Sequence, residues 1–92
     1  MEKIYVVIHI SYEIGGENAD AITSTEAFTD LDKANKFFDH GLAINPFLKT
    51  PDWFHHSVNR CAVGTHERDG RKFQHRLFLM RKYANPEPDK FF

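Results

Sequence analysis

Histidine and cysteine are the side chains in this chain best suited to acid–base, nucleophilic or metal chemistry. The 92 residues contain six histidines and one cysteine, Cys61. No two histidines stand four residues apart and no second thiol is present, so the spacings typical of zinc sites do not occur. We therefore expect ordinary surface or core histidines, with no bound metal and no cofactor. A metal-dependent enzyme that uses the histidines is the least favoured alternative.

Nucleophilic or paired-carboxylate catalysis is also disfavoured. Cys61 is expected in the middle of a strand opposite Phe78, and an apolar neighbour raises a thiol pKa rather than lowering it. The carboxylates of Asp30, Asp32 and Asp39 are better explained as helix caps and solvated helix positions. The sequence thus predicts a protein that is not an enzyme and has no small-molecule substrate.

The first half of the chain predicts a hairpin followed by a helix. Alternation from Lys3 to Glu13 indicates a strand with one apolar face, formed by Ile4, Val6, Ile8, Ile10 and Tyr12. The Gly15-Gly16 pair should turn the chain before a second strand from Ala21 to Phe28.

Helical spacing replaces the alternation after Phe28. Leu31, Ala34, Phe37 and Phe38 recur as one apolar face of a helix of about three turns. Thr29 or Asp30 is expected to cap its first N–H groups. Gly41 is expected to end it.

The last third contains an Asp69-Gly70 pair between alternating stretches, which favours a two-residue type I′ turn. That turn fixes the register of the hairpin. On one face the predicted pairs include Arg68 with Arg71, His66 with Phe73, Gly64 with His75, Ala62 with Leu77 and Arg60 with Leu79, and beyond them Val58 with Arg81. This face should pack under the helix. The predicted fold is therefore α+β, a ββαββ domain over residues 1–83 with a four-stranded antiparallel sheet and one helix on one face, followed by a flexible tail over residues 84–92.

Residues 42–56 contain two prolines, and their large apolar side chains include Phe47, Leu48, Trp53 and Phe54. Two interpretations stay open. The segment can fold over the open end of the core, or Trp53 and Phe54 can form an exposed aromatic anchor for a partner.

The charges nearly cancel overall but are segregated along the chain. Residues 1–46 contain 3 basic and 8 acidic side chains, whereas residues 47–92 contain 9 basic and 5 acidic side chains.

A single cysteine excludes an intramolecular disulfide and favours a reducing compartment. The longest apolar run is far shorter than the roughly 20 residues that span a bilayer, and the opening residues lack the order of a signal peptide. We expect a soluble cytoplasmic protein that does not contact a membrane.

The C-terminal hairpin is the most basic part of the sequence, with seven Lys or Arg and two acids between residues 60 and 82. These charges can be solvated groups that protect strand edges, contacts to nucleic acid phosphates, or contacts to an acidic or RNA-bearing protein surface. The predicted contact residues are Arg60, Arg68, Arg71, Lys72, Arg76, Phe78 and Lys82. Tyr5 and His9 are expected on the same outer face as further stacking platforms. A basic partner would instead meet the acidic first hairpin, through Glu13, Glu17, Asp20 and Glu26.

Three stretches, MEKIYVVIHISYEIGGENAD, TDLDKANKFFDHG and RDGRKFQHRLFLMRKY, carry a resemblance that covers the whole chain. The sequence resembles the small phage-encoded anti-CRISPR proteins, in particular inhibitors of the type I-F surveillance complex. This resemblance implies a protein that binds the subunits of that RNA-guided complex in the infected bacterial cell. Some of these inhibitors also reach the guide RNA, which is therefore a further candidate contact. Steric occlusion would then block target DNA hybridisation. The family has no shared motif, so it assigns no residue by position. The alternative is a small phage or bacterial domain that binds nucleic acid directly through a basic, aromatic sheet face.

Overall fold

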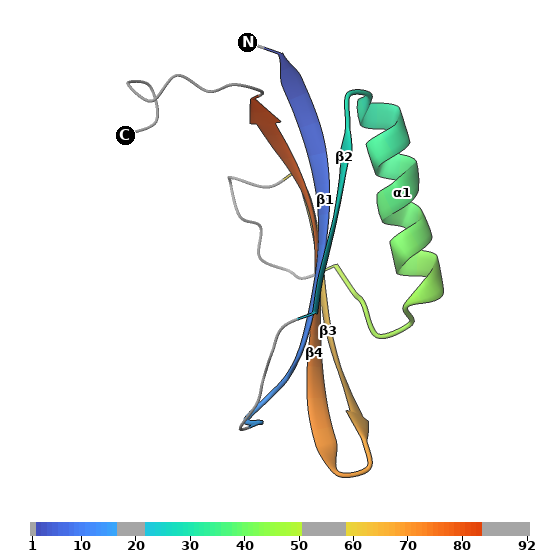
Figure 1. Ribbon diagram of the computed structural model, residues 1–92. Coiled ribbons are helices and arrows are strands. Elements are labelled where there is room, and N and C mark those ends of the chain that lie inside the picture. Colours follow the sequence, from blue (N-terminus) through green and yellow to red (C-terminus); the bar gives the residue numbers. More distant parts are fainter. Residues whose placement is uncertain (1, 17–21, 51–58, 84–92) are drawn as a thin grey trace.

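Four strands and one helix make up the computed structural model, which describes residues 2–16, 22–50 and 59–83. The elements are β1 (Lys3–Glu13), β2 (Ile22–Phe28), α1 (Leu31–Ile44), β3 (Arg60–Arg68) and β4 (Arg71–Tyr83). The strands form one antiparallel sheet in the order β2-β1-β4-β3, and α1 covers one of its faces (Figure 1). The predicted ββαββ architecture is confirmed. The expectations for Glu17, Asp20, Trp53, Phe54, Val58 and the tail over 84–92 lie outside the described residues.

The β3–β4 hairpin has the register that its turn predicts. Asp69 and Gly70 both adopt positive φ, at 54° and 75°, as a type I′ turn requires. Pairing then runs from Arg68 with Arg71 to Arg60 with Leu79. A single dipeptide therefore fixes which side chains of two strands share a face.

The register of β1 against β4 decides which face of β1 lies under the helix. Val7 pairs with Leu79 and His9 pairs with Leu77, and residues directly opposite each other point to the same side of a sheet. The odd-numbered side chains of β1, including Tyr5 and His9, therefore share the helix side. The prediction that Tyr5 and His9 lie on the outer face was wrong, because both faces of this central strand carry apolar side chains and alternation alone does not say which one α1 covers.

Helix α1 begins where the sequence predicts and ends later. The Asp30 carboxylate caps it by accepting a hydrogen bond from the Asp32 backbone N–H at 2.8 Å. At the other end Gly41 lies inside the helix, and the Asn45 N–H donates to its carbonyl. The prediction that Gly41 ends the helix was wrong. A Cβ at this position would lie 3.0 Å from a Leu77 methyl, so the glycine allows α1 to approach β4 closely.

The core lies between α1 and the sheet. Its buried side chains come from the helix, the segment after it and three strands: Val7, Ala34, Phe38, Leu48, Ala62, Leu77 and Leu79. The Ala62 and Leu77 face of the hairpin packs under the helix, as predicted. Leu48 belongs to this core, which agrees with the packing interpretation for that residue, whereas the Phe47 side chain remains 43% exposed.

Residues 45–49, which we call the strap, cross from α1 to the edge of β3. Lys49 pairs with Val63 through two backbone hydrogen bonds of 2.9 Å. The strap thereby covers part of the β3 edge. Among the described residues, no helix has the length and apolar character needed to cross a membrane.

Candidate functional site

The outer face of the sheet, opposite α1, carries four of the predicted contact residues. Lys72, Arg76, Phe78 and Lys82 alternate along β4 and so point to this side. The three cations are exposed. Within the described residues, none of them forms an ion pair, in contrast to three other arginines of the hairpin.

The centre of the outer face is apolar. Ile8 lies opposite Phe78, and Ile10 lies opposite Arg76. Ile4, Val6 and Met80 belong to the same face by register and are half-buried, like Ile8, Ile10 and Phe78. The outer face therefore joins an apolar centre to a row of cations on β4.

Cys61 also lies on the outer face, opposite Phe78 as predicted. Its side chain is buried. Burial raises the pKa of the Cys61 thiol, and the nearby Arg76 charge opposes this only in part. A thiol held in its protonated form is a poor nucleophile.

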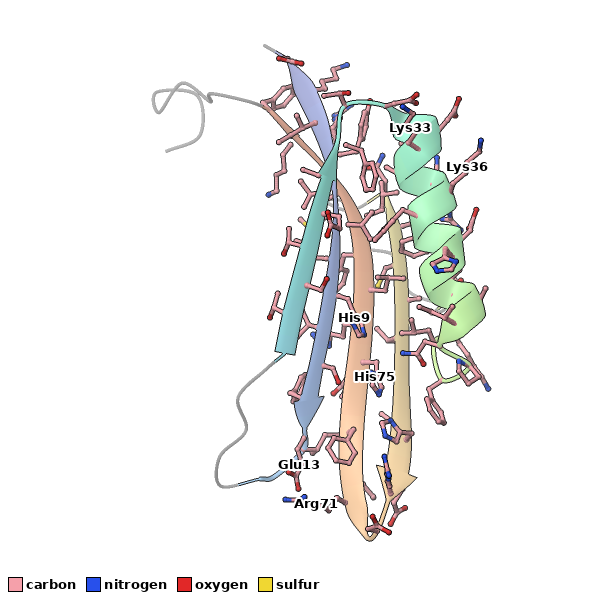
Figure 2. All side chains as sticks on the ribbon, turned by 45° about the vertical axis from the view of Figure 1, so that its right-hand side comes forward. His9, Glu13, Lys33, Lys36, Arg71 and His75 are labelled. Carbon is pink, nitrogen blue, oxygen red and sulfur yellow. The ribbon has the colours of Figure 1, made fainter. Side chains whose placement is uncertain are left out.

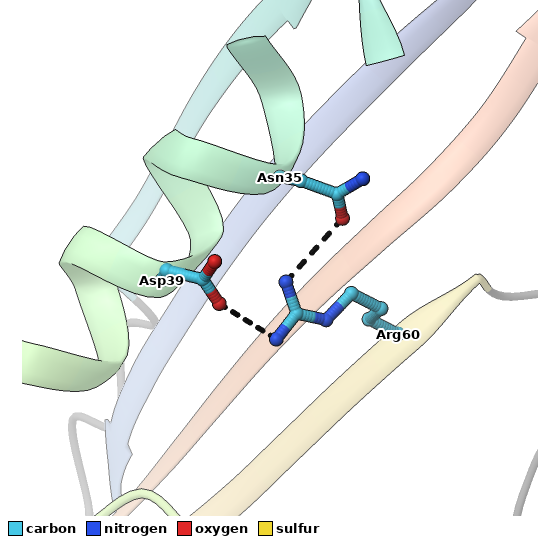
Figure 3. A network of polar contacts seen from close by, with 3 residues as sticks. All are labelled: Asn35, Asp39 and Arg60. Atoms are coloured by element: carbon cyan, nitrogen blue, oxygen red, sulfur yellow. Dashed lines mark hydrogen bonds and ion pairs between the residues drawn. The ribbon is translucent and has the colours of Figure 1, made fainter. Parts of the chain in front are cut away.

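The Arg60 side chain lies on the helix side of the sheet and contacts α1. Its guanidinium donates to Asp39 at 2.7 Å and to the Asn35 side-chain oxygen at 3.3 Å (Figure 3). The same group lies 4.3 Å from the centroid of the Phe38 ring. Arg60 therefore links β3 to α1, and the structure does not bring it together with the cations of the outer face.

The hairpin tip places two more predicted residues away from that row. Arg71 pairs with Glu13 at 3.0 Å (Figure 2). Arg68 lies 3.9 Å from Asp69. By register, Arg68 and Arg71 point to the helix side. Glu13 was predicted to contact a basic partner, yet it is matched by a cation of this chain.

Glu13 and Glu26, the two predicted acidic contact residues that the structure describes, lie far apart on the sheet. Glu26 pairs with Val7, six positions along β1 from Glu13, which corresponds to about 20 Å of strand. Because Glu13 is paired and distant from Glu26, the described residues provide no continuous acidic patch at these two positions.

A cluster of histidines is the feature that sequence reasoning missed. His66 Nδ1 and His75 Nε2 lie 2.7 Å apart, so one proton bridges the two rings. The His9 ring is parallel to the His75 ring, at 5.9 Å between centroids, and Phe47 stacks on His66 at 4.6 Å. The hairpin register already put His66 and His75 on one face, but the wrong face for β1 left His9 out.

A cavity of about 380 Å³ lies beside the histidines, between the C-terminal half of α1, the strap and the sheet. His9 and His75 are among the residues that line it, and their side chains lie on neighbouring strands of the sheet (Figure 2). Burial, together with the neighbouring His66 and His9, lowers the pKa of His75 below its ordinary value. In the part of the chain that the structure describes, no group of three or more His, Cys, Asp or Glu side chains is placed to hold a metal ion.

Comparisons with protein-family models, with curated proteins and with solved structures find no match to this chain. The fold defines the class: a small α+β domain with a ββαββ order and one helix-covered sheet face. Arguments about function therefore depend on the outer face and on the histidine-lined cavity.

Proposed function

We propose that this protein is a non-enzymatic inhibitor that binds the type I-F crRNA-guided surveillance complex and blocks target DNA hybridisation by steric occlusion. The observation that carries the proposal is the outer face, where Lys72, Arg76 and Lys82 form no ion pair within the described residues and flank an apolar centre. The resemblance to small anti-CRISPR proteins supplies the identity of the partner. On this proposal the protein acts in the cytoplasm of the infected bacterial cell.

The composition of the outer face suits a macromolecular partner. Interfaces combine an apolar core with a charged or polar rim, and Ile8, Ile10 and Phe78 provide such a core. The cations extend from position 72 to position 82 of one strand, a length of about 33 Å. Arg and Lys over that length can contact several phosphates of a guide RNA or a row of acidic side chains.

Reversing the charge of the outer face tests this proposal. The variant Lys72→Glu with Arg76→Glu should no longer co-elute with the assembled type I-F complex on a sizing column, and target DNA binding by the complex should be retained. The matched control is Lys33→Glu with Lys36→Glu, which makes the same charge change on the exposed side of α1, away from the sheet (Figure 2). This control variant should co-elute like the unmodified protein and prevent DNA binding.

Two results would contradict the proposal. Failure of the unmodified protein to co-elute would remove the type I-F complex as its partner. Equal loss of binding in both double variants would show that net charge, and not the outer face, decides the interaction.

Direct binding of nucleic acid is the second candidate, and the placement of Arg76 beside Phe78 on one face favours it. Alternating cations and aromatic rings bind single strands through phosphates and base stacking. Affinity for naked guide RNA should then fall with salt, with a log–log slope of about −2 for three phosphate contacts. Binding to the complex without binding to the naked RNA would reject this candidate.

A further inference from the structure

The free edge of β2 lacks the features that keep other strands away from a sheet. β2 is an outermost strand, and among the described residues only β1 pairs with it. Positions 23–27 are exposed. The strand reads ITSTEAF, with no Pro, Lys or Arg, and its pairing with β1 runs without a bulge from Ser11–Ile22 to Tyr5–Phe28. Natural proteins protect edges with such residues or with bulges, because an open edge offers unpaired N–H and C=O groups to another strand.

The opposite edge of the sheet is protected. The strap lies along β3, where Lys49 and Val63 form two backbone hydrogen bonds. β2 has no such cover among the described residues, and its seven residues exceed the length of an average strand, about five or six. Thr23 and Thr25 are β-branched, which favours strand pairing. The sheet can therefore be extended at β2, whereas the strap occupies part of the β3 edge.

The β2 strand is complementary to a second copy of itself. When identical antiparallel strands pair about a two-fold axis, the residue on the axis faces itself, and Thr25 is the midpoint of Ile22–Phe28. An axis at Thr25 pairs all seven residues of the strand. It places Ser24 opposite Glu26 of the second copy, where the hydroxyl can donate to the carboxylate. An axis at Glu26 would instead place two carboxylates opposite each other, which is unfavourable.

We propose that two copies of this chain pair through β2, antiparallel about an axis at Thr25, and form one eight-stranded sheet. Residues opposite each other point to the same side of a sheet, so both helices cover the same face. The pairing places Phe28 of the second copy opposite position 22, two residues from Ser24. Ile44 lines the cavity together with Ser24 and is 68% exposed. The incoming ring would thus lie near the most exposed large apolar side chain among the described residues.

The pairing of two chains is independent of the proposed function, because the edge of β2 and the cations of β4 are separate features. In the eight-stranded sheet the two outer faces lie side by side, and five strand spacings separate one β4 from the other. At about 4.8 Å per spacing, the two rows of cations stand about 24 Å apart on one face. A pair of chains would therefore present the proposed contact surface twice.

Sedimentation equilibrium of the full chain tests the proposal. From about 1 μM to about 500 μM, the mass should rise from one chain toward two, as expected for an affinity in the micromolar range. Thr25→Lys places two cations opposite each other on the axis and should raise the dissociation constant roughly five-fold or more. Thr65→Lys is the matched control, because Thr65 is an exposed threonine on the outer face of the other edge strand. The control should associate like the unmodified protein. A single-chain mass at all concentrations, or equal weakening by both variants, would overturn the proposal.

Disulfide trapping locates the contact independently. In the proposed register Thr25 faces itself, and opposite Cα atoms of antiparallel strands lie about 4.5 to 5.5 Å apart, within the span of a disulfide. Thr25→Cys should therefore form a covalent pair of chains on mild oxidation, detected by electrophoresis without reductant. Thr65→Cys should remain a single chain, as should the unmodified protein, whose Cys61 is buried. No covalent pair in Thr25→Cys, or equal trapping of both variants, would contradict the assignment.

Discussion

The backbone carbonyl oxygen of Phe47 occupies the space into which a Cβ at position 64 would point, so Gly64 is the residue that lets the strap cross β3. The neighbouring Lys49 and Val63 then form their two backbone hydrogen bonds. Leu48 lies between these contacts and enters the core.

This close approach predicts that Gly64→Ala destabilises the protein by about 2 kcal/mol or more, because the methyl group displaces the strap and exposes Leu48. Urea denaturation measures the change. Thr65→Ala, at the next and exposed position of β3, is the control and should cost less than about 1 kcal/mol. Equal stability of Gly64→Ala and the unmodified protein would mean that the strap does not pack on β3.

The link from Arg60 to α1 predicts different effects for its two ends. Arg60→Ala should cost about 1 to 2 kcal/mol, because it removes the hydrocarbon stem and the guanidinium that cover the Phe38 ring. Asp39→Asn should cost less than about 1 kcal/mol, because the Asp39 side chain is 60% exposed and water screens the ion pair. Thermal denaturation of both variants measures this difference. A larger loss in Asp39→Asn than in Arg60→Ala would assign the role of Arg60 to charge pairing.

Stability should rise with pH as His75 loses its proton. Its pKa in the folded protein lies below the ordinary value of 6.5, because of burial and of the neighbouring His66 and His9. The folded state therefore binds fewer protons than the unfolded state between the lowered pKa and 6.5, and stability decreases as the pH falls through this range. His75→Phe should show a smaller loss between neutral and mildly acidic pH in urea titrations. An unchanged pH dependence in this variant would exclude His75 as the group responsible.

Local signals predicted the order of the elements and the register of one hairpin. Asp69 and Gly70 favour a two-residue turn over a longer loop, and Asp30 precedes the first residue of the helix, where a capping side chain is needed. Both features depend on neighbouring residues alone. The face of β1 and the role of Gly41 depend on Leu77 and Leu79, which approach from a distant strand. A pattern in one segment does not contain that information.

The candidate site was predictable only in part, for the same reason. Counting charges identified the hairpin as basic, and alternation placed Lys72, Arg76, Phe78 and Lys82 on one face. Neither pattern showed that Arg60 forms an ion pair with Asp39 on the helix, because that contact joins residues 21 positions apart in sequence. The histidine cluster required three strands in register, and the sequence-based interpretation placed His9 of β1 on the opposite face of the sheet.

The ion pair of Glu13 and Arg71 predicts that their charges can be exchanged. The Arg71 Nε lies 3.0 Å from the Glu13 carboxylate, with the two side chains 65% and 25% exposed, so the pair should contribute no more than about 1 kcal/mol. Each single reversal, Glu13→Arg or Arg71→Glu, places like charges together and should lower the melting temperature. The double exchange restores opposite charges and should recover most of that loss.

The affinity of the double-exchange variant for the type I-F complex should equal that of the unmodified protein, because this pair points to the helix side and the proposed contact is on the outer face. Loss of affinity in the double exchange, with stability recovered, would instead make the hairpin tip part of the interface and shift the proposed contact away from Arg76.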